Sequence, residues 1–259
     1  KNTVIITAEK KDKTIIKTIQ SCLNQTNKNL EIIVAYSKFK DENKIKKNIN
    51  SKKVIFFKIK KKLKNKVRDQ LFKIEQSLKI SKGRNIFLLD GDDIFNKKKI
   101  EIISKIINNR EIMILDNYFT ISNNAKFKNK IMNHKKNYFY KRFINDWPKN
   151  VCTSAISIER KLLFKFFKEI KISKYKYLAI DILLAIYCNR GGKLLRVNKF
   201  FTNKIELSDS VDKNYVGYDN RLYWHRRLEQ HRYNFFIKKK SYFNFDFLIS
   251  YILSFLFRI

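Results

Sequence analysis

The amino-acid sequence predicts an α/β fold, with a mixed, mostly parallel sheet flanked by helices and a basic, aromatic helical extension at the C-terminal end. Short apolar runs, such as residues 3–8 and 85–89, alternate with amphipathic stretches through the first half of the chain. Such alternation is typical of a parallel sheet with helices on both faces. A basic and aromatic segment over residues 215–240 precedes a strongly apolar one over residues 245–259.

The first half of the chain predicts five strands and four helices in alternation. Each predicted strand is a short aliphatic run, and each predicted helix repeats apolar residues at intervals of three or four. The strands are expected at residues 3–8, 30–36, 53–59, 85–89 and 112–118, and the helices at residues 14–25, 41–50, 67–78 and 97–108. Gly83 is expected to stop the third helix, because glycine often follows the last helical turn.

The second half has a less regular pattern. Residues 215–240 are expected to be helical, and no internal repeat is visible. We expect a hairpin or loop at residues 127–140, strands at 151–158 and 193–197, and helices at 160–168 and 178–189. Gly191 and Gly192 are expected to break the second of these helices.

The chain is large enough for one α/β domain with a short appendage, or for two small domains, because it has 259 residues of which 44% are hydrophobic.

The formal net charge of the chain, +35, has three explanations. Nucleic acid would be attracted by such a charge, and so would an anionic membrane surface. An AT-rich coding bias toward Lys, Asn and Ile is the third explanation, and the wide spread of the lysines favours it. The lysine run at residues 238–240 favours a membrane surface more than the scattered lysines do, because it directly precedes the apolar tail.

The three cysteines are expected to be buried free thiols in a reducing compartment. Cys22, Cys152 and Cys188 are odd in number, lie far apart in the sequence, and each occurs in an apolar stretch. No spacing of Cys and His resembles a zinc site.

Asp90, Gly91, Asp92 and Asp93 form a DGDD sequence directly after a predicted buried strand. Several carboxylates so close together repel one another unless a cation or hydrogen-bond donors compensate them. Mg²⁺ and Mn²⁺ prefer carboxylate oxygens and often share their ligands with substrate phosphates. The alternative is a turn that caps the next helix, where Asp is common. Ligands of parallel sheets bind beyond the carboxyl ends of the strands, and this position favours the metal site.

Four segments together resemble family 2 glycosyltransferases, which have the Rossmann-like GT-A fold. The segment that ends in DGDD is the most specific of the four, and the resemblance covers roughly residues 3–210. The similar segments are residues 3–37 with Ser21, Gln25 and Thr26 in a Ser-x-x-x-Gln-Thr pattern, Val67-Arg68-Asp69, Gly83 followed by residues 85–93, and Ala179-Ile180-Asp181 at the start of a helix.

The resemblance implies a metal-dependent, inverting enzyme that moves a sugar from a nucleotide-diphosphate sugar, most commonly a UDP-sugar, to a glycan or lipid-linked acceptor. It implies surface polysaccharide biosynthesis and no nucleic-acid partner. The implied donor-binding residues are Thr7, Ala8, Glu9, Tyr36, Arg68, Asp90, Gly91 and Asp92. Asp92 and Asp93 are the implied ligands of Mn²⁺ or Mg²⁺, and Asp181 is the implied general base.

The sequence also departs from the family pattern at several positions. Ala35-Tyr36-Ser37 replaces the usual Asp-Asp-Gly-Ser, Ala8-Glu9-Lys10 replaces Pro-x-Tyr-Asn, and Ile180 stands where an acidic residue often precedes the base. Two alternatives follow for the missing carboxylate contact: Tyr36 stacks on the nucleobase in its place, or the contact is lost. The departures leave open a catalytically degenerate partner subunit. The charge and the aromatic residues over 215–233 leave open a nucleic-acid-binding protein, although the DGDD placement argues against it.

The resemblance divides the chain into a GT-A domain and a C-terminal extension. The domain is expected over residues 1–212, with a nucleotide-sugar-binding half at 1–120 and an acceptor-side half at 121–212, and the extension over 213–259. The apolar tail is shorter than the about 20 residues that cross a bilayer. We expect it to lie on the inner face of the cytoplasmic membrane with lysines toward anionic headgroups, or to pack on the domain or a second subunit. The enzyme is accordingly expected to be cytoplasmic.

Overall fold

The structure of the chain is a computed structural model that describes residues 1–8, 12–122, 125–130, 148–206, 215, 217–238 and 244–256. Glu9, one of the predicted donor-binding residues, lies outside these ranges, and so do residues 131–140 of the expected hairpin or loop.

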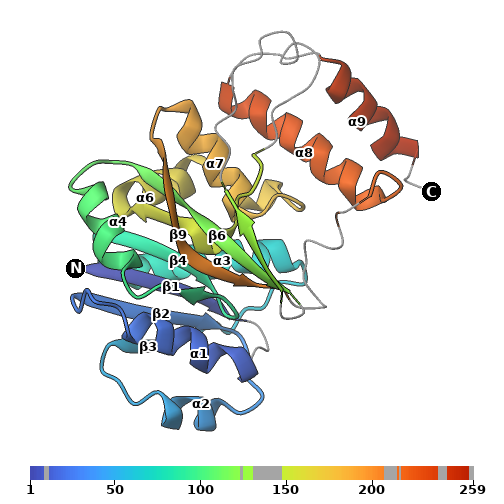
Figure 1. Cartoon of the computed structure of the whole chain (residues 1–259). Helices are drawn as coiled ribbons and strands as arrows, with labels where there is room; N and C mark the ends of the chain where they lie inside the picture. The colour runs from blue at the N-terminus through green and yellow to red at the C-terminus, as the bar shows by residue number, and fades with distance from the viewer. Residues whose placement is uncertain are drawn as a thin grey trace.

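A single sheet with helices on both faces forms the body of the molecule (Figure 1). Its strands are β1 (Asn2–Ala8), β2 (Leu30–Tyr36), β3 (Val54–Lys58), β4 (Asn85–Asp90), β5 (Ile94–Phe95), β6 (Met113–Ser122), β7 (Ala125–Asn129), β8 (Ile156–Glu159) and β9 (Leu194–Ile205). The helices are α1 (Asp12–Leu23), α2 (Glu42–Asn48), α3 (Lys66–Ile80), α4 (Lys99–Ile107), α6 (Arg160–Glu169), α7 (Ile180–Arg190), α8 (Arg221–Lys238) and α9 (Phe245–Leu256). Two 3₁₀ turns, η1 (Thr153–Ala155) and η2 (Ile172–Lys174), join them.

The sheet is mixed, as the sequence predicts. Its strand order is β3-β2-β1-β4-β8-β6-β9-β5, and β7 pairs with β6 outside this order. The first four strands in the order are parallel to one another. Strand β8 lies antiparallel between β4 and β6, so that β6 again runs parallel to β4. The carboxyl ends of β1, β2 and β4 therefore meet at one edge.

Two hydrophobic cores lie on the two faces of this sheet. Helices α3, α6 and α7 cover one core, which contains Ile5 of β1, and helices α1, α2 and α4 cover the other, which contains Val4 and Ile6. Adjacent side chains of β1 thus enter opposite cores, as the alternation along a strand requires. This is why the central strands read as continuous apolar runs rather than as alternating ones.

The structure corrects several expected boundaries in the second half. Residues 151–158 are expected to be one strand, but the 3₁₀ turn η1 interrupts them and only their end belongs to β8. Strand β9 continues to Ile205 and β6 to Ser122, beyond their predicted ends. These two strands pair with each other past the edge of the hydrophobic core, where backbone hydrogen bonds no longer need apolar side chains. On its other edge, β9 pairs with the two-residue strand β5, which has no sequence signal of its own.

Gly83 has a different role from the predicted helix stop. Helix α3 ends at Ile80, and Ser81 caps it. A Cβ atom at Gly83 would lie 2.4 Å from the backbone nitrogen of Thr3, so only glycine fits beside the start of β1.

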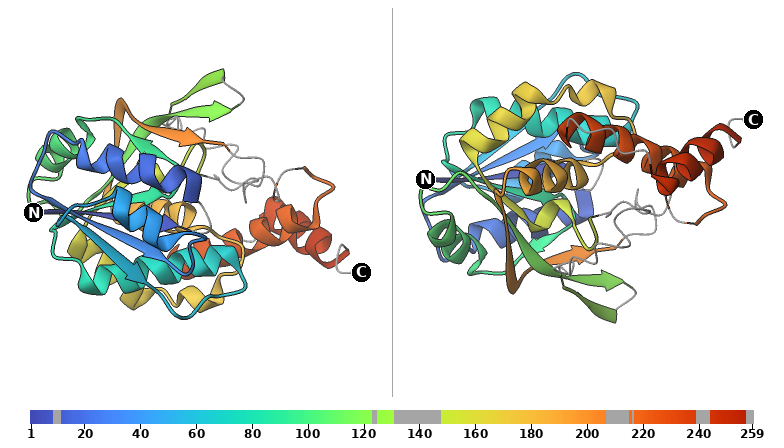
Figure 2. Two further views of the ribbon diagram at one scale, coloured as in Figure 1. Left: turned by 90° about the horizontal axis from the view of Figure 1, so that it is seen from below. Right: turned by 90° about the horizontal axis from the view of Figure 1, so that it is seen from above.

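The C-terminal helices lie at one end of the molecule, where α8 packs on α7 and α9 packs on α8 on the side away from the sheet (Figures 1 and 2). Tyr233 of α8 is fully buried and donates a hydrogen bond to the carbonyl of Leu183 at 3.0 Å. Residues of α8 therefore belong to the same hydrophobic core as those of α7. Among the described residues, no helix is long and apolar enough to cross a membrane.

The three cysteines are buried and free, as predicted. Burial raises the pKa of the Cys22 and Cys188 thiols to about 12. The thiols are therefore protonated and unreactive at neutral pH.

Candidate active site

The predicted donor-binding residues on β1, β2 and β4 lie together at the carboxyl ends of these parallel strands, which we call the strand edge. Thr7 is paired with Asp90, and Ala8 is paired with Tyr36, in the register of the sheet. The backbone of the next residue, Gly91, continues this contact by donating to the carbonyl of Thr7 at 2.9 Å. The end of β4 is thus tied to the end of β1 where the DGDD turn begins.

The carboxylate of Asp90 is oriented by two neighbours. Its Oδ1 accepts hydrogen bonds from Gln70 of α3 at 2.7 Å and from the Thr7 hydroxyl at 3.2 Å. On the other side of the turn, the Thr14 hydroxyl donates to the carbonyl of Gly91 at 3.0 Å. Sequence reasoning missed Gln70, whose only signal is its position two residues after Arg68 in the Val-Arg-Asp segment.

Asp93 points into the protein rather than toward the strand edge. Its two carboxylate oxygens accept hydrogen bonds from the Ser154 hydroxyl at 2.5 Å and from the backbone nitrogen of Ile205 at 2.8 Å, and the residue is 2% exposed. The Ser154 Oγ also accepts a bond from the Asp90 backbone nitrogen at 3.0 Å. Burial, and then the charges of Asp90 and Asp92, raise the pKa of Asp93 to about 8. The turn therefore concentrates more negative charge than its surroundings accommodate.

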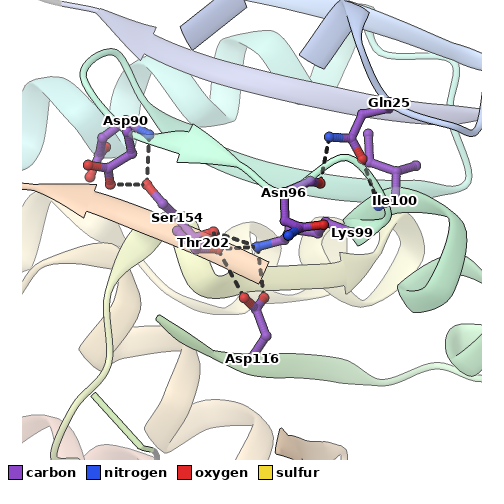
Figure 3. A network of polar contacts seen from close by, with 9 residues as sticks. Gln25, Asp90, Asn96, Lys99, Ile100, Asp116, Ser154 and Thr202 are labelled. Atoms are coloured by element: carbon purple, nitrogen blue, oxygen red, sulfur yellow. Dashed lines mark hydrogen bonds and ion pairs between the residues drawn. The ribbon is translucent and has the colours of Figure 1, made fainter. Parts of the chain in front are cut away.

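A buried ion pair supports the turn from beneath (Figure 3). Lys99 of α4 lies 2.7 Å from Asp116 of β6, and both side chains are fully buried. The Lys99 ammonium also donates to the Ser154 carbonyl at 2.7 Å and to the Thr202 hydroxyl at 2.8 Å. Thr202 in turn donates to Asp116 at 2.9 Å. One network thus joins α4, β6, β9 and η1. It supports Ser154, the residue that bonds both Asp90 and Asp93.

The Ser-x-x-x-Gln-Thr pattern fixes the segment that follows the turn. Gln25 donates to the carbonyl of Asn96 at 2.8 Å and accepts from the backbone nitrogen of Ile100 at 3.1 Å (Figure 3). The Ser21 hydroxyl accepts from the backbone nitrogen of Phe95 at 3.2 Å. The end of α1 therefore anchors both the short strand β5 and the start of α4.

Asp181 lies in the first turn of α7, directly after the segment that Arg68 of α3 contacts. It is half-buried, and its Oδ1 accepts a hydrogen bond from the backbone nitrogen of Ile182 at 2.7 Å. The charges of Asp93 and Asp181 both act on the buried Cys152 thiol. Burial and then the charge of Asp93 raise its pKa, and the charge of Asp181 adds to this effect. Both carboxylates thus act electrostatically on one side chain.

A family model described as Glycosyl transferase family 2 matches residues 3–167. The chain belongs to this family. It is therefore a glycosyltransferase, and the resemblance stated from its motifs is confirmed. A search of curated protein sequences found no match.

Solved structures confirm the GT-A fold of this glycosyltransferase. Residues 1–349 of S. aureus TarS in complex with UDP-GlcNAc superpose with a TM-score of 0.65 at 11% identity, over 98% of this chain and 70% of that one. The same protein in complex with UDP gives a TM-score of 0.62 at 11% identity, over 98% and 69%. A longer TarS structure gives a TM-score of 0.56 at 12% identity, over 91% of this chain and 43% of that one. At these identities the likeness is one of fold.

Arg68 of the glycosyltransferase contacts the connection between α6 and α7 rather than the DGDD turn. Its guanidinium donates to the backbone carbonyls of Ser173 and Tyr175. From the opposite side, Glu229 of α8 accepts hydrogen bonds from three successive backbone nitrogens, those of residues 176, 177 and 178, at 2.6, 2.6 and 2.9 Å. The segment just before Asp181 is therefore held between α3 and α8. Sequence reasoning missed Glu229.

Replacing Glu229 with Gln is expected to destabilise the glycosyltransferase by about 1–3 kcal/mol and to lower transfer without weakening donor binding. The single amide oxygen can keep at most two of the three backbone bonds, so at least one backbone donor loses its partner. The free energy of unfolding, the donor affinity and the transfer rate measure the three effects. Glu75→Gln, a half-exposed glutamate of α3, is the matched control. A transfer rate that stays at the wild-type level in Glu229→Gln would contradict the positioning role.

Tyr36 does not present its ring to the strand edge as expected. The ring is 1% exposed, and it stacks on Phe39 with centroids 4.4 Å apart. Its hydroxyl donates to Glu42 at 2.6 Å. Of the two alternatives for Tyr36, the structure favours loss of the nucleobase contact, because Phe39 already stacks on the ring.

A second buried ion pair holds the end of β1. Lys73 of α3 lies 2.7 Å from Asp69, one helical turn earlier, and both side chains are almost fully buried. The Lys73 ammonium also donates to the carbonyl of Ala8 at 3.1 Å. Asp69, which the sequence shows only as the last residue of the Val-Arg-Asp segment, therefore positions the predicted donor-binding residue Ala8.

Proposed function

We propose that this glycosyltransferase moves a sugar from a UDP-sugar to a hydroxyl group of a glycan or lipid-linked acceptor, with inversion, in the synthesis of a cell-surface polysaccharide. The observation that carries the proposal is the DGDD turn, which is fixed at the paired ends of β1 and β4. S. aureus TarS, which has the same fold, has been solved with UDP and with UDP-GlcNAc. UDP-GlcNAc is therefore the first donor to test.

The donor set of the turn fits a divalent cation held by Asp92. Asp92 lies between two anchored carboxylates, because Asp90 is oriented by Gln70 and Asp93 is bonded to Ser154 and Ile205. Among the described residues, no three His, Cys, Asp or Glu side chains form a ready metal cage. The remaining ligands would come from the phosphates of the donor, as is common for Mg²⁺. Bound there, Mn²⁺ or Mg²⁺ would neutralise the charge of the departing diphosphate.

The same contacts change the role that we propose for Asp93. Both of its oxygens are engaged within the protein, so we assign it to holding the turn rather than to the cation. Asp90, Gly91, Thr7 and Ala8 stay in the proposed donor site, because they line the strand edge in register.

Asp181 would take the proton of the acceptor hydroxyl. The hydroxyl oxygen attacks the anomeric carbon of the donor sugar, and the bond between that carbon and the diphosphate breaks. Such a single displacement inverts the anomeric centre and needs no protein nucleophile. Asp181 suits this role because it is half-exposed at the start of a helix. We further propose that the enzyme works in the cytoplasm, which the three free thiols support.

Asp92→Asn is expected to lose metal-dependent nucleotide binding. The wild-type protein should be stabilised against thermal unfolding by UDP or UDP-GlcNAc in the presence of Mn²⁺, since a ligand that binds only the folded state raises the melting temperature. Asp92→Asn should show no such shift, because its amide lacks the charge that holds the cation. Asp41→Asn, a substitution at the N-cap of α2, is the control for loss of an Asp elsewhere.

Two results would contradict the proposal. A wild-type shift of equal size with and without Mn²⁺ would remove the cation from the donor site. A shift produced by oligonucleotides, with none produced by any nucleotide sugar, would favour nucleic-acid binding instead.

A further inference from the structure

Helix α9 buries its polar residues and leaves most of its large apolar side chains exposed. The buried polar residues on and next to this helix are Asn244, Asp246, Ser250 and Ser254. The exposed apolar residues are Phe245, Leu248, Tyr251, Ile252, Phe255 and Leu256, with 36–64% of their surface accessible. A surface helix ordinarily turns its apolar side to the protein. Helix α9 directs Phe247 toward α8, where it packs on His231 and Phe235, but leaves the six large apolar side chains above exposed.

Specific polar contacts with α8 fix this orientation. Arg227 donates two hydrogen bonds to the Asp246 carboxylate, at 2.8 and 2.7 Å. His231 lies 3.4 Å from the same carboxylate. Paired bonds between a guanidinium and a carboxylate are among the strongest and most directional in proteins. Rotating α9 to hide its apolar side would break them, so the exposed apolar face is a built feature of the fold.

We propose that the apolar face of α9 docks the enzyme on the surface of an anionic lipid membrane. The helix has 12 residues and is therefore about 18 Å long, shorter than the roughly 30 Å hydrocarbon core of a bilayer. It would lie in the plane of the membrane, with its apolar side chains at the boundary between headgroups and acyl chains. Phe236, exposed near the end of α8, extends the apolar surface.

The charge of the chain favours lipid over a second copy of the protein. Residues 217–256 contain seven Lys and Arg against three acidic residues. Two of these acids are turned inward, Asp246 to Arg227 and Glu229 to the backbone before α7. Arg232 is exposed one helical turn before Phe236. With a net charge of +35, two copies repel each other, whereas an anionic surface attracts each of them.

The size of the face also argues against a stable dimer. The exposed apolar side chains of a helix about 18 Å long offer less accessible surface than the roughly 800 Å² that each partner buries in a typical interface. A membrane sets no such minimum, because its binding strength simply grows with the apolar area inserted.

Flotation of the full chain with lipid vesicles tests the proposal. We expect the wild-type protein to bind vesicles of phosphatidylcholine with phosphatidylglycerol, and to bind pure phosphatidylcholine less tightly. The double variant Leu248→Ser/Ile252→Ser should bind the anionic vesicles at least about tenfold more weakly, because two inserted aliphatic side chains are lost at constant charge. Ile55→Ser/Ile80→Ser replaces two equally exposed apolar residues elsewhere and should bind like wild type. All four residues are exposed, so both variants should unfold at the wild-type temperature.

Two outcomes would overturn the proposal. Equal binding of wild type and Leu248→Ser/Ile252→Ser to anionic vesicles would show that charge alone attracts the protein. A concentration-dependent dimer in sedimentation that Leu248→Ser/Ile252→Ser removes would show that the face joins two copies. Neither readout depends on donor or metal, so failure here leaves the proposed glycosyl transfer standing.

Discussion

Asp181→Asn is expected to lower the transfer rate by about 10²–10⁴ while leaving donor binding unchanged. General base catalysis contributes a factor of this size, and an amide cannot take the proton of the acceptor hydroxyl. Donor binding should persist because the DGDD turn is fixed by its contacts with Thr7, Gln70 and Ser154. The measurements are the initial rate of sugar transfer and the metal-dependent thermal shift produced by UDP-GlcNAc.

The control for Asp181→Asn separates lost chemistry from a disturbed helix. Asp181 also accepts the backbone nitrogen of Ile182, and a negative charge in the first turn of α7 stabilises the helix. Asp181→Ser keeps a hydrogen-bond acceptor at the helix start but provides no base. If Asp181 is the base, both variants are inactive and both bind the donor. Substantial activity in Asp181→Asn would assign the residue to capping α7 alone.

The alternation of strands and helices up to α4 could be predicted from the sequence because each element there has a strong period of its own. Strand β2, for example, has the bounds expected from residues 30–36. The position of Asp90 at a strand end follows from the same pattern. A polar cluster directly after a buried apolar run must lie where the strand leaves the core, at its carboxyl end. Local periodicity therefore locates the turn in the fold without any knowledge of its neighbours.

The neighbours of that turn could not be predicted, because they come from distant parts of the chain. Ser154, which bonds both Asp90 and Asp93, lies in a stretch that alternates like a strand but forms η1 instead. The direction of a side chain is equally hidden. Arg68 matches the family segment, yet its guanidinium faces residues 173 and 175, and Gln70 contacts Asp90 in its place.

One signal for the support of the site was present in the sequence. Asp116 interrupts the apolar strand at residues 112–118, and an acidic residue in a buried strand needs a partner. The sequence offers 58 lysines and arginines as that partner and does not single one out. Only the packing of α4 on the sheet identifies Lys99.

Lys99→Met is expected to destabilise the folded protein by about 3–5 kcal/mol, which is the usual effect of removing one partner of a buried ion pair. Asp116 would be left buried without its counter-charge, and Thr202 and the Ser154 carbonyl would each lose a donor. Chemical denaturation followed by circular dichroism measures the change. Lys105→Met is the matched control, because Lys105 lies on the same helix and pairs with Glu101 at the surface. It should unfold at the wild-type denaturant concentration.

The pH dependence of the Lys99→Met variant has a definite sign. Burial raises the pKa of Asp116 even with Lys99 present, and removing the ammonium raises it further. A carboxyl group whose pKa is higher in the folded state than in the unfolded state destabilises the fold progressively as pH rises above the unfolded value. The deficit of Lys99→Met relative to wild type should therefore be smaller at pH 5 than at pH 8. The double variant Lys99→Met/Asp116→Asn removes the group that titrates, so its deficit relative to wild type should not grow from pH 5 to pH 8. A deficit in Lys99→Met that does not change with pH would show that Asp116 finds another cation, and the network behind Ser154 would then not depend on Lys99.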